Sequence, residues 1–204
     1  SEYTFNGKMG KKGVLAGKFT PPTKGHLNYI IEASTMVEEL IVIVSENRNL
    51  TKKLCEENNL PYMSGETRAK WLTSELSGFK HIKVKLLDET HIPTYPDGWK
   101  PWSNMVKELV GDFDVIFGNE YEYAAQNAIY FPNARYIITD LNRNEFNISA
   151  TKLRSNPLKY WDFTLGSTRS TLCKKVLIAG SESCGKSTIT KYLAKIFNTS
   201  WSEE

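Results

Sequence analysis

The chemistry that this sequence could perform is most visible at residues 17–26, where glycines, a lysine and a histidine stand together. Gly17 and Gly25 would let backbone N–H groups approach a phosphate without a Cβ in the way. A helix expected to start at this turn would add partial positive charge at its N-terminus. Lys18 supplies a point charge, and His26 can donate a proton to a phosphate oxygen. The segment therefore predicts an anion-binding turn.

A second group of phosphate-binding residue types lies at 148–154. Ser149 and Thr151 offer hydroxyl groups, and a helix start near Ala150 offers backbone amides. Arg154 adds a forked donor that suits phosphate. Taken singly, the first segment also fits a proline-rich loop with a capping histidine, and the second fits a helix start with an exposed arginine. Their occurrence together, in this order and about a domain apart, favours a polyphosphate site.

Apolar runs that alternate with helical periodicity would position these two groups. The continuous aliphatic run at 40–44 suits a strand that is covered on both faces of a parallel sheet. Ser64 and Pro101 are residue types favoured at a helix N-cap and in a first helical turn. We therefore expect an α/β fold with right-handed crossovers and a doubly wound parallel sheet. The expected strands are residues 14–16, 40–44, 82–87, 115–117 and 135–139. Three helices are expected: one from after Pro21 to near Val37, one from Ser64 to near Leu76, and one from Pro101 to near Val110.

The unusual segments of the chain each follow an expected strand. They are residues 17–21, residues 45–48, an aromatic and proline-rich loop at 92–102, and the Gly-Asn-Glu sequence at 118–120. In a doubly wound sheet the ligand lies beyond the carboxyl ends of the strands. We therefore expect these segments to converge on one site, where the amide and carboxylate side chains of 118–120 would contact adenine or ribose.

The bulk composition describes an ordinary globular protein. Of the 204 residues, 40% are hydrophobic and 24% are charged, and the formal net charge of +3 is too small to favour a nucleic-acid partner. The longest aliphatic run is too short to span a bilayer, and no signal peptide opens the chain. Three irregularly spaced cysteines favour neither a disulfide framework nor a zinc site and fit a reducing cytosol. We expect a cytoplasmic protein without a membrane or nucleic-acid partner, and homo-oligomerisation stays open.

The sequence divides into a main domain and a shorter C-terminal segment. Residues 1–12, rich in glycine and lysine, predict a flexible tail, and the main domain would span 13–165. The Ser/Thr/Gly-rich stretch at 166–174 predicts a linker. The pattern then restarts at 175–204, with an expected strand at 175–179.

The C-terminal segment contains a P-loop pattern between this expected strand and a helix that would end near Phe197. Lys186 would reach the β- and γ-phosphates, and Ser187 would hold Mg²⁺. Too few residues follow for an acidic metal-binding strand, a catalytic base or a lid, so we expect the opening of an incomplete kinase domain. The residues of the pattern are Gly180, Ser183, Gly185, Lys186 and Ser187.

The TKGH sequence at 23–26 and the ISATKLR sequence at 148–154 resemble the T/HxGH and ISxTxxR motifs of the nucleotidyltransferase superfamily. The resemblance implies a Rossmann-like sheet, and in-line attack of a substrate phosphate on the α-phosphate of ATP with release of pyrophosphate. It assigns catalysis to His26 at the transferring phosphate, to Lys18 as its counter-charge, and to Arg154 at the departing phosphates, with Mg²⁺ shared among these phosphates and no protein ligand to the metal. The implied ATP- and NAD-binding residues are Gly17, Phe19, Thr20, Thr23, Gly25, Gly118, Asn119, Glu120, Ile148, Ser149 and Thr151.

The aromatic loop indicates the second substrate. A tryptophan face attracts a flat cationic ring, and nicotinamide mononucleotide carries such a ring. Ligand contact is favoured for Trp99, whereas a structural role is about as well supported for Trp102. Arg48 could bind the substrate phosphate, and a solvated loop arginine is an equal alternative. The expected mononucleotide-binding residues are Arg48, Tyr95, Asp97, Trp99 and Trp102.

An adenylyltransferase followed by a P-loop, with a YPDGWKPW loop, is similar to the bifunctional nicotinamide mononucleotide adenylyltransferase/ribosylnicotinamide kinase family of the NadR type. The resemblance covers most of residues 13–199 and implies synthesis of NAD from nicotinamide mononucleotide and ATP. Some family members carry an N-terminal helix-turn-helix domain, for which the residues before Gly13 are too few, so we expect no DNA binding.

Two alternatives remain open at this point. A phosphopantetheine adenylyltransferase of a CoA-synthase-like fusion would also precede a P-loop kinase, but its substrate lacks the aromatic cation that the tryptophan loop favours. A non-catalytic module that senses NAD or another nucleotide would keep the binding residues. The presence of both His26 and Lys18 argues for catalysis instead.

Overall fold

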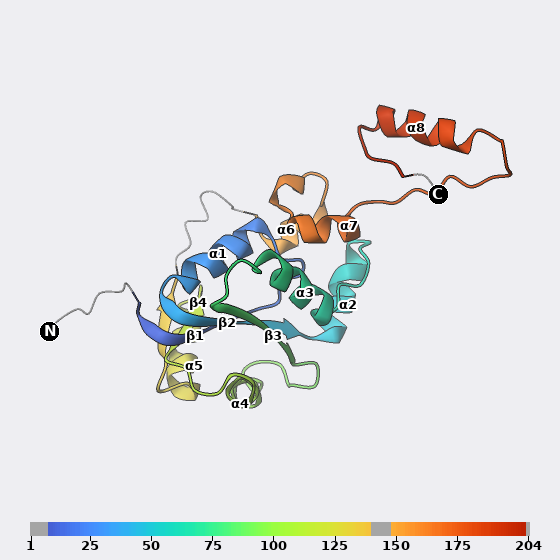
Figure 1. Cartoon of the computed structure of the whole chain (residues 1–204). Coiled ribbons are helices and arrows are strands. Elements are labelled where there is room, and N and C mark those ends of the chain that lie inside the picture. The colour runs from blue at the N-terminus through green and yellow to red at the C-terminus, as the bar shows by residue number, and fades with distance from the viewer. Residues whose placement is uncertain (1–7, 140–147, 203–204) are drawn as a thin grey trace. The chain divides into compact units, whose positions relative to one another are not determined.

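A computed structural model describes residues 8–139 and 148–202, which form two compact units (Figure 1). The first unit comprises Ser1–Leu172 and the second comprises Cys173–Glu204. The boundary lies within the stretch that the sequence predicted as a linker. Each unit is described by itself.

The first unit is built on a five-stranded sheet with the strand order β3-β2-β1-β4-β5. All four neighbouring pairs are parallel, and helices cover both faces, so the predicted doubly wound α/β fold is confirmed. The order reverses between β1 and β4, and the carboxyl end of β1 therefore lies at the switch point where such sheets bind ligands. The strands are β1 (Gly10–Gly17), β2 (Val37–Glu46), β3 (Ile82–Asp88), β4 (Val115–Gly118) and β5 (Arg135–Ile138).

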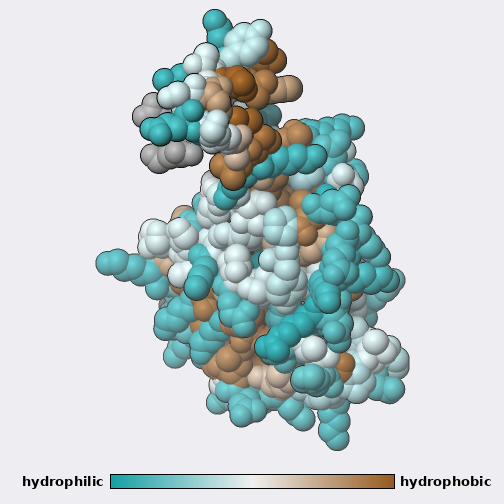
Figure 2. All heavy atoms as spheres, turned by 90° about the vertical axis from the view of Figure 1, so that its right-hand side faces the viewer, coloured by the Kyte–Doolittle hydropathy of each residue, from teal (hydrophilic) through white to brown (hydrophobic). Residues whose placement is uncertain are grey.

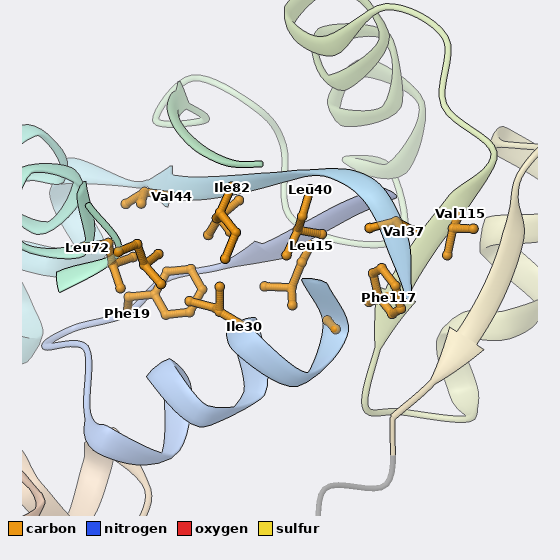
Figure 3. Packing of buried hydrophobic residues seen from close by; sticks show 13 residues of the cluster. Leu15, Phe19, Ile30, Val37, Leu40, Val44, Leu72, Ile82, Val115 and Phe117 are labelled. Atoms are coloured by element: carbon orange, nitrogen blue, oxygen red, sulfur yellow. The ribbon is translucent and has the colours of Figure 1, made fainter. Parts of the chain in front are cut away.

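Helices on opposite faces of the sheet enclose two core clusters. Helices α1 and α3 cover one face and α4 and α5 the other, as Figure 1 shows. Figure 3 shows Leu15 of β1 and Leu40 of β2 packed with Ile30 of α1. The helices of this unit are α1 (Lys24–Ser34), α2 (Arg48–Glu57), α3 (Gly65–Glu75), α4 (Trp99–Val110), α5 (Glu122–Tyr130), α6 (Ala150–Ser155) and α7 (Arg169–Leu172), with 3₁₀ turns at Trp161–Phe163 and Gly166–Thr168.

The aliphatic run of β2 is buried on both faces, as its composition predicted. Leu40, Val42 and Val44 belong to the cluster beneath α1 and α3, whereas Ile41 and Ile43 belong to the cluster beneath α4. None of the five is more than 1% exposed. Burial of one such side chain stabilises the fold by roughly 1.5–3 kcal/mol.

Some element boundaries differ from the prediction. Val37 begins β2 instead of ending α1, because α1 is capped at Thr35 and the chain turns directly into the sheet. Residues 10–12 were expected in a flexible tail, but they form the start of β1. They pair with β2, and the backbone N–H groups of Lys11 and Lys12 donate to the carboxylate of Asp114.

Helices α2 and α5 were missed because few of their residues are buried, which leaves no apolar period in the sequence. In α2 only Thr51 and Cys55 are buried, and the exposed side pairs Lys52 with Glu56 and Lys53 with Glu57. In α5 only Asn127 is buried.

The predicted cap at Ser64 is confirmed, since its side chain accepts a hydrogen bond from the backbone N–H of Thr67 at 3.1 Å.

The stretch expected to be a linker is ordered up to Leu172. Thr168 and Leu172 are buried, and the backbone N–H of Ser167 donates to the carboxylate of Glu75 on α3 at 3.0 Å. The hydroxyl of Thr168 donates to the carbonyl of Leu165, three residues back, at 2.8 Å.

The second unit contains α8 (Lys186–Ile196) after an irregular segment. The strand expected at 175–179 does not form, because a strand needs a hydrogen-bonded neighbour and none pairs with these residues in the described chain. Val176 and Leu177 are 80% and 85% exposed. Figure 2 accordingly shows hydrophobic side chains on the surface of this unit.

Candidate active site

The loop after β1 is held in place by Phe19. Its ring is buried, its backbone adopts a φ of 51°, and it lies edge-on to the ring of His26 with centroids 5.2 Å apart. A Cβ at Gly17 would lie 2.8 Å from the Phe19 ring, so glycine is required here to make room for a side chain. Lys18, between these two residues, has an exposed side chain that is directed away from the core.

Thr23 and His26 form a reciprocal cap at the start of α1. The hydroxyl of Thr23 accepts the backbone N–H of His26 at 3.3 Å, and the backbone N–H of Thr23 donates to Nδ1 of His26 at 3.1 Å. Nδ1 is therefore the unprotonated nitrogen of the neutral ring, and the proton lies on Nε2. The TKGH sequence thus orients a half-buried imidazole whose Nε2 can donate, beside a helix N-terminus.

The second motif lies on the six-residue helix α6 and joins the first motif directly. Ser149 caps α6 by accepting the backbone N–H of Lys152 at 3.2 Å, and Leu153 is fully buried against Cys55 and Met63. Nη1 of Arg154 donates to the carbonyl of Thr20 at 2.6 Å. The two segments, 134 residues apart at this contact, therefore lie together as expected.

Arg154 is buried, although the alternative interpretation of its segment expected an exposed arginine. Only 7% of it is exposed, and its Nη2 donates to the Thr151 hydroxyl at 3.3 Å. Its Nε is buried and lacks a hydrogen-bond partner, a state that costs free energy. Burial lowers the pKa of the guanidinium from its ordinary value. An arriving phosphate oxygen would satisfy the orphaned donor.

The tryptophans of the aromatic loop are largely buried, and ligand contact by Trp99 stays a prediction. Trp99 and Trp102 begin α4, and each is 7% exposed. The Trp99 ring stacks on Tyr130 of α5 with centroids 6.1 Å apart and planes 3° apart, and it stands edge-on to Trp102. Periodic burial of α4 decides this, because the same helix face also buries Val106.

Other members of the predicted mononucleotide site are accessible. Tyr95 is 54% exposed with its ring centroid 5.1 Å from that of Trp99, and Asp97 is exposed. Burial chiefly raises the pKa of Tyr95 to about 12, so its phenol is neutral and can donate. Gly98 is fixed by packing, because a Cβ there would collide with the carbonyl of Pro93.

Arg48 and the segment after β4 follow the ends of two strands, β2 and β4, that lie on either side of β1. Arg48 opens α2 and forms an exposed ion pair with Asp88 at 3.1 Å, so it is neither unpartnered nor buried. Gly118 leaves room for the Tyr136 phenol, which donates to the carbonyl of Glu120 at 2.8 Å. Asn119 and Glu120 are exposed at the end of β4, as a role in nucleotide contact requires.

Two charged residues of this region escaped the sequence analysis. Arg68 of α3 is fully buried, and its guanidinium pairs with the carboxylate of Glu46 and donates to the carbonyl of Lys18. Glu89, just after β3, is half-buried; burial raises its pKa, while Lys18 and Arg68 oppose the rise. A lone arginine in a polar helix gives no sequence signal of burial, because its partners are backbone carbonyls from distant segments.

No cluster of three or more His, Cys, Asp or Glu side chains suited to a metal occurs in the described ranges. Ser149 and Thr151, at the start of α6, are exposed. No helix among residues 8–139 and 148–202 is long and apolar enough to cross a membrane.

In the second unit, local bonds shape the backbone of residues 180–187, which the sequence predicted as a P-loop. Ser183 and Gly185 adopt φ values of 60° and 85°, and Nζ of Lys186 donates to the carbonyls of Gly180 and Ser181 at 3.0 and 2.8 Å. Lys186 and Ser187 open α8, as the pattern predicted.

Comparison with known proteins places the first unit among nucleotide-handling enzymes. The family model for cytidylyltransferase-like proteins matches residues 14–156. The trifunctional NAD biosynthesis/regulator protein NadR of Escherichia coli is 31% identical over 92% of this chain and 47% of its own length. The chain thus spans about half the length of this curated relative.

Two further relatives bear on the substrate. A crystal structure of NadR protein in complex with NAD and AMP-PNP superposes with a TM-score of 0.78 at 28% identity, covering 96% of this chain and 56% of that one. The phosphopantetheine adenylyltransferase of Legionella pneumophila (strain Paris) is 35% identical over 38% of this chain and 40% of its own length.

Proposed function

The chain belongs to the cytidylyltransferase-like family, and we propose that its first unit transfers AMP from ATP to nicotinamide mononucleotide, giving NAD and pyrophosphate. The observation that carries the proposal is the hydrogen bond from Arg154 to the carbonyl of Thr20, which joins the two motifs at the end of β1. One polyphosphate could then be bound by the N-terminus of α1 and the N-terminus of α6 at once. The similarity to NadR along most of the chain supports the choice of substrate.

The proposed reaction needs positioning and charge more than covalent chemistry. The phosphate of the mononucleotide attacks the α-phosphorus of ATP, and the bond to the bridging oxygen of pyrophosphate breaks in line with the attack. His26 donates from Nε2 to an α-phosphate oxygen, and Lys18 offsets the negative charge that builds up there. Alignment of two bound reactants can lower such a barrier by about 7–11 kcal/mol.

The β- and γ-phosphates would lie at the start of α6 in this proposal. The hydroxyls of Ser149 and Thr151 are exposed there, and the unpartnered Nε of Arg154 would donate to a phosphate oxygen. Mg²⁺ bound to these phosphates would neutralise charge on the leaving group. The adenosine would contact Gly118, Asn119 and Glu120 at the end of β4.

The nicotinamide ring would contact the accessible side of the aromatic cluster. Because Tyr130 covers one face of Trp99, the exposed ring of Tyr95 is the better placed partner in this structure. Asp97 and Arg48 would complete the mononucleotide site, with Arg48 exchanging part of its ion pair with Asp88 for the substrate phosphate. Phosphopantetheine has no aromatic cation for which such a cluster would be selective.

The test is pyrophosphate release from ATP with either nicotinamide mononucleotide or phosphopantetheine, with the product identified by mass spectrometry. We expect NAD with the first substrate and at most trace product with the second. Turnover of phosphopantetheine alone would replace the proposed substrate. Nucleotide binding without pyrophosphate release would favour the sensing module instead.

For the second unit we propose a phosphate-binding P-loop of the ribosylnicotinamide kinase type. The left-handed backbone at Ser183 and Gly185 supports it, since that conformation turns successive N–H groups toward an anion. The measurement is ATP binding by a His26→Ala chain with and without Lys186→Ala. Equal affinity in the two chains would contradict a P-loop contribution.

A further inference from the structure

Arg68 lies outside both phosphate motifs but contacts the loop that carries Lys18. It is 0% exposed on α3, and its Nη1 donates to the carbonyl of Lys18 and, at 3.3 Å, to the carbonyl of Ser45. Lys18 follows β1 and Ser45 lies near the end of β2. One guanidinium therefore joins the carboxyl ends of the two central strands.

The remaining donors of Arg68 are also in use. Nε donates to the carbonyl of Met63 at 3.0 Å, and Nη2 donates to the buried carboxylate of Glu46 and, at 3.5 Å, to the hydroxyl of Thr51. All five N–H bonds of the planar fork thus have an acceptor. A lysine carries three donors on one nitrogen and cannot reach this arrangement.

The same loop is held from its other side by Arg154, which donates to the carbonyl of Thr20. The hydroxyl of Thr20 also donates to the carbonyl of Lys18 at 3.3 Å. Two buried guanidiniums therefore bond carbonyls two residues apart, on either side of Phe19. Since Phe19 has a φ of 51°, the backbone there needs such support to stay in a sparsely populated region.

We propose that Arg68 is a positioning residue for AMP transfer: it holds the carbonyl of Lys18 and thereby directs the Lys18 ammonium at the transferring phosphate. The inference rests on the proposed function for the role of Lys18. Arg68 itself, buried beneath the loop, does not touch substrate. Its effect is therefore exerted through the backbone of residues 17–20.

The experiment compares Arg68→Lys with Leu76→Ala in the full chain. Leu76 is a buried residue at the C-terminal end of α3, so its loss destabilises the same helix without reaching the Lys18 carbonyl. We expect Arg68→Lys to lower kcat about 100-fold with a smaller change in the KM for ATP, because a displacement of about 1 Å has an effect of that size. Leu76→Ala should keep kcat within about threefold of the wild type while it remains folded.

A double-mutant comparison with Lys18→Ala distinguishes a positioning role of Arg68 from a general loss of stability. In a Lys18→Ala background, Arg68→Lys should lower kcat by less than about threefold further, because both changes remove the same contribution. Full additivity of the two losses would overturn the proposal. An equal fall of kcat in Leu76→Ala at matched stability would overturn it too.

If Arg68→Lys fails to fold, the double variant Arg68→Met/Glu46→Leu removes both buried charges together, a change that often preserves folding. It should retain the loss of kcat. Unimpaired kcat in this folded double variant would refute the role of Arg68.

Amide hydrogen exchange of residues 17–20 gives a readout that does not depend on the substrate. Arg68→Lys should speed exchange there, and Leu76→Ala should not. Faster exchange in a chain that makes no NAD would mean that the proposed function is wrong and the positioning role is right. Unchanged exchange would count against the positioning role whatever the chain synthesises.

Discussion

The two segments that we propose to bind phosphate are supported in opposite ways. In the first unit, the loop after β1 is buried at Phe19 and Thr20 and is bonded by arginines from α3 and α6. In the second unit, residues 180–185 are exposed, and the ammonium of Lys186 donates to the carbonyls five and six residues before it. The first geometry depends on the whole sheet, whereas the second is made locally.

This difference shows which parts of a phosphate site need tertiary structure. A turn of glycines before a helix can form the anion-binding backbone by itself. The strand that normally precedes it cannot, because its hydrogen bonds and its apolar side chains need neighbours. Residues 175–179 illustrate the point, with Val176 and Leu177 exposed and unpaired in the described structure.

The largest expected effect breaks the first segment at His26. His26→Ala should lower the turnover of AMP transfer by about 10²–10⁴-fold, because it removes the proton donor at the transferring phosphate. His26→Asn is the matched variant, since its side-chain oxygen can still accept the backbone N–H of Thr23. Steady-state kinetics should show a comparable loss in both variants, and thermal melting should show wild-type stability for His26→Asn. Near-normal turnover in either folded variant would remove His26 from the mechanism.

The second effect compares the packing of the two segments. Leu153→Ala opens a cavity under α6, where Leu153 is fully buried, and should lower the free energy of unfolding by about 2–5 kcal/mol. Leu177→Ala in the second unit changes an exposed side chain and should stay within about 0.5 kcal/mol of the wild type. Urea denaturation of both variants measures the difference. Equal destabilisation would show that the second segment is packed after all.

A smaller effect is expected from acid, through the anchoring of β1. Burial raises the pKa of Asp114, but the hydrogen bonds from the backbone of Lys11 and Lys12 outweigh it and hold the pKa below its ordinary value. The ionised carboxylate therefore stabilises the fold above the ordinary pKa of aspartate, near 3.9, and this stability is lost as the pH falls through the lower folded value. Asp114→Asn should flatten the dependence of the melting temperature on pH between about 5 and 3. A wild-type slope in that variant would contradict the anchor.

The smallest effect on AMP transfer is expected from a change in the second segment, because the two segments should act independently. Lys186→Ala removes the lysine of the second segment and should leave AMP transfer within about twofold of the wild type, because both segments that we propose for the transferase site lie in the first unit. The measurement is NAD formation under the conditions used for His26→Ala. A large loss would mean that the two units act together.

The class of fold and the two phosphate motifs were readable from the sequence because their signals are local or periodic. The run at 40–44 predicts a doubly covered strand from composition alone, and the structure confirms it. The cap at Ser64 depends on residues three apart. Helix α2 was missed because only two of its residues are buried, which is too few for a period to show.

The roles of the glycines and tryptophans were less accessible. Gly17 was predicted to let a phosphate approach, and in the structure it also makes room for the Phe19 ring. Trp99 was predicted to face a ligand, but Tyr130 stacks on it. In both cases the deciding neighbour is set by packing, and a sequence pattern carries no information on which ring fills which space.

The sequence by itself determined that this is a parallel α/β protein and indicated where phosphate could bind, because hydrophobic periodicity and helix N-terminal chemistry act over a few residues. Only the tertiary structure decided that Arg154 reaches Thr20 and that Arg68 reaches Lys18, contacts that span 134 and 50 residues. Such pairs form because a buried guanidinium must find acceptors for its N–H bonds. The fold brings the free carbonyls at the ends of its strands within reach of these two arginines.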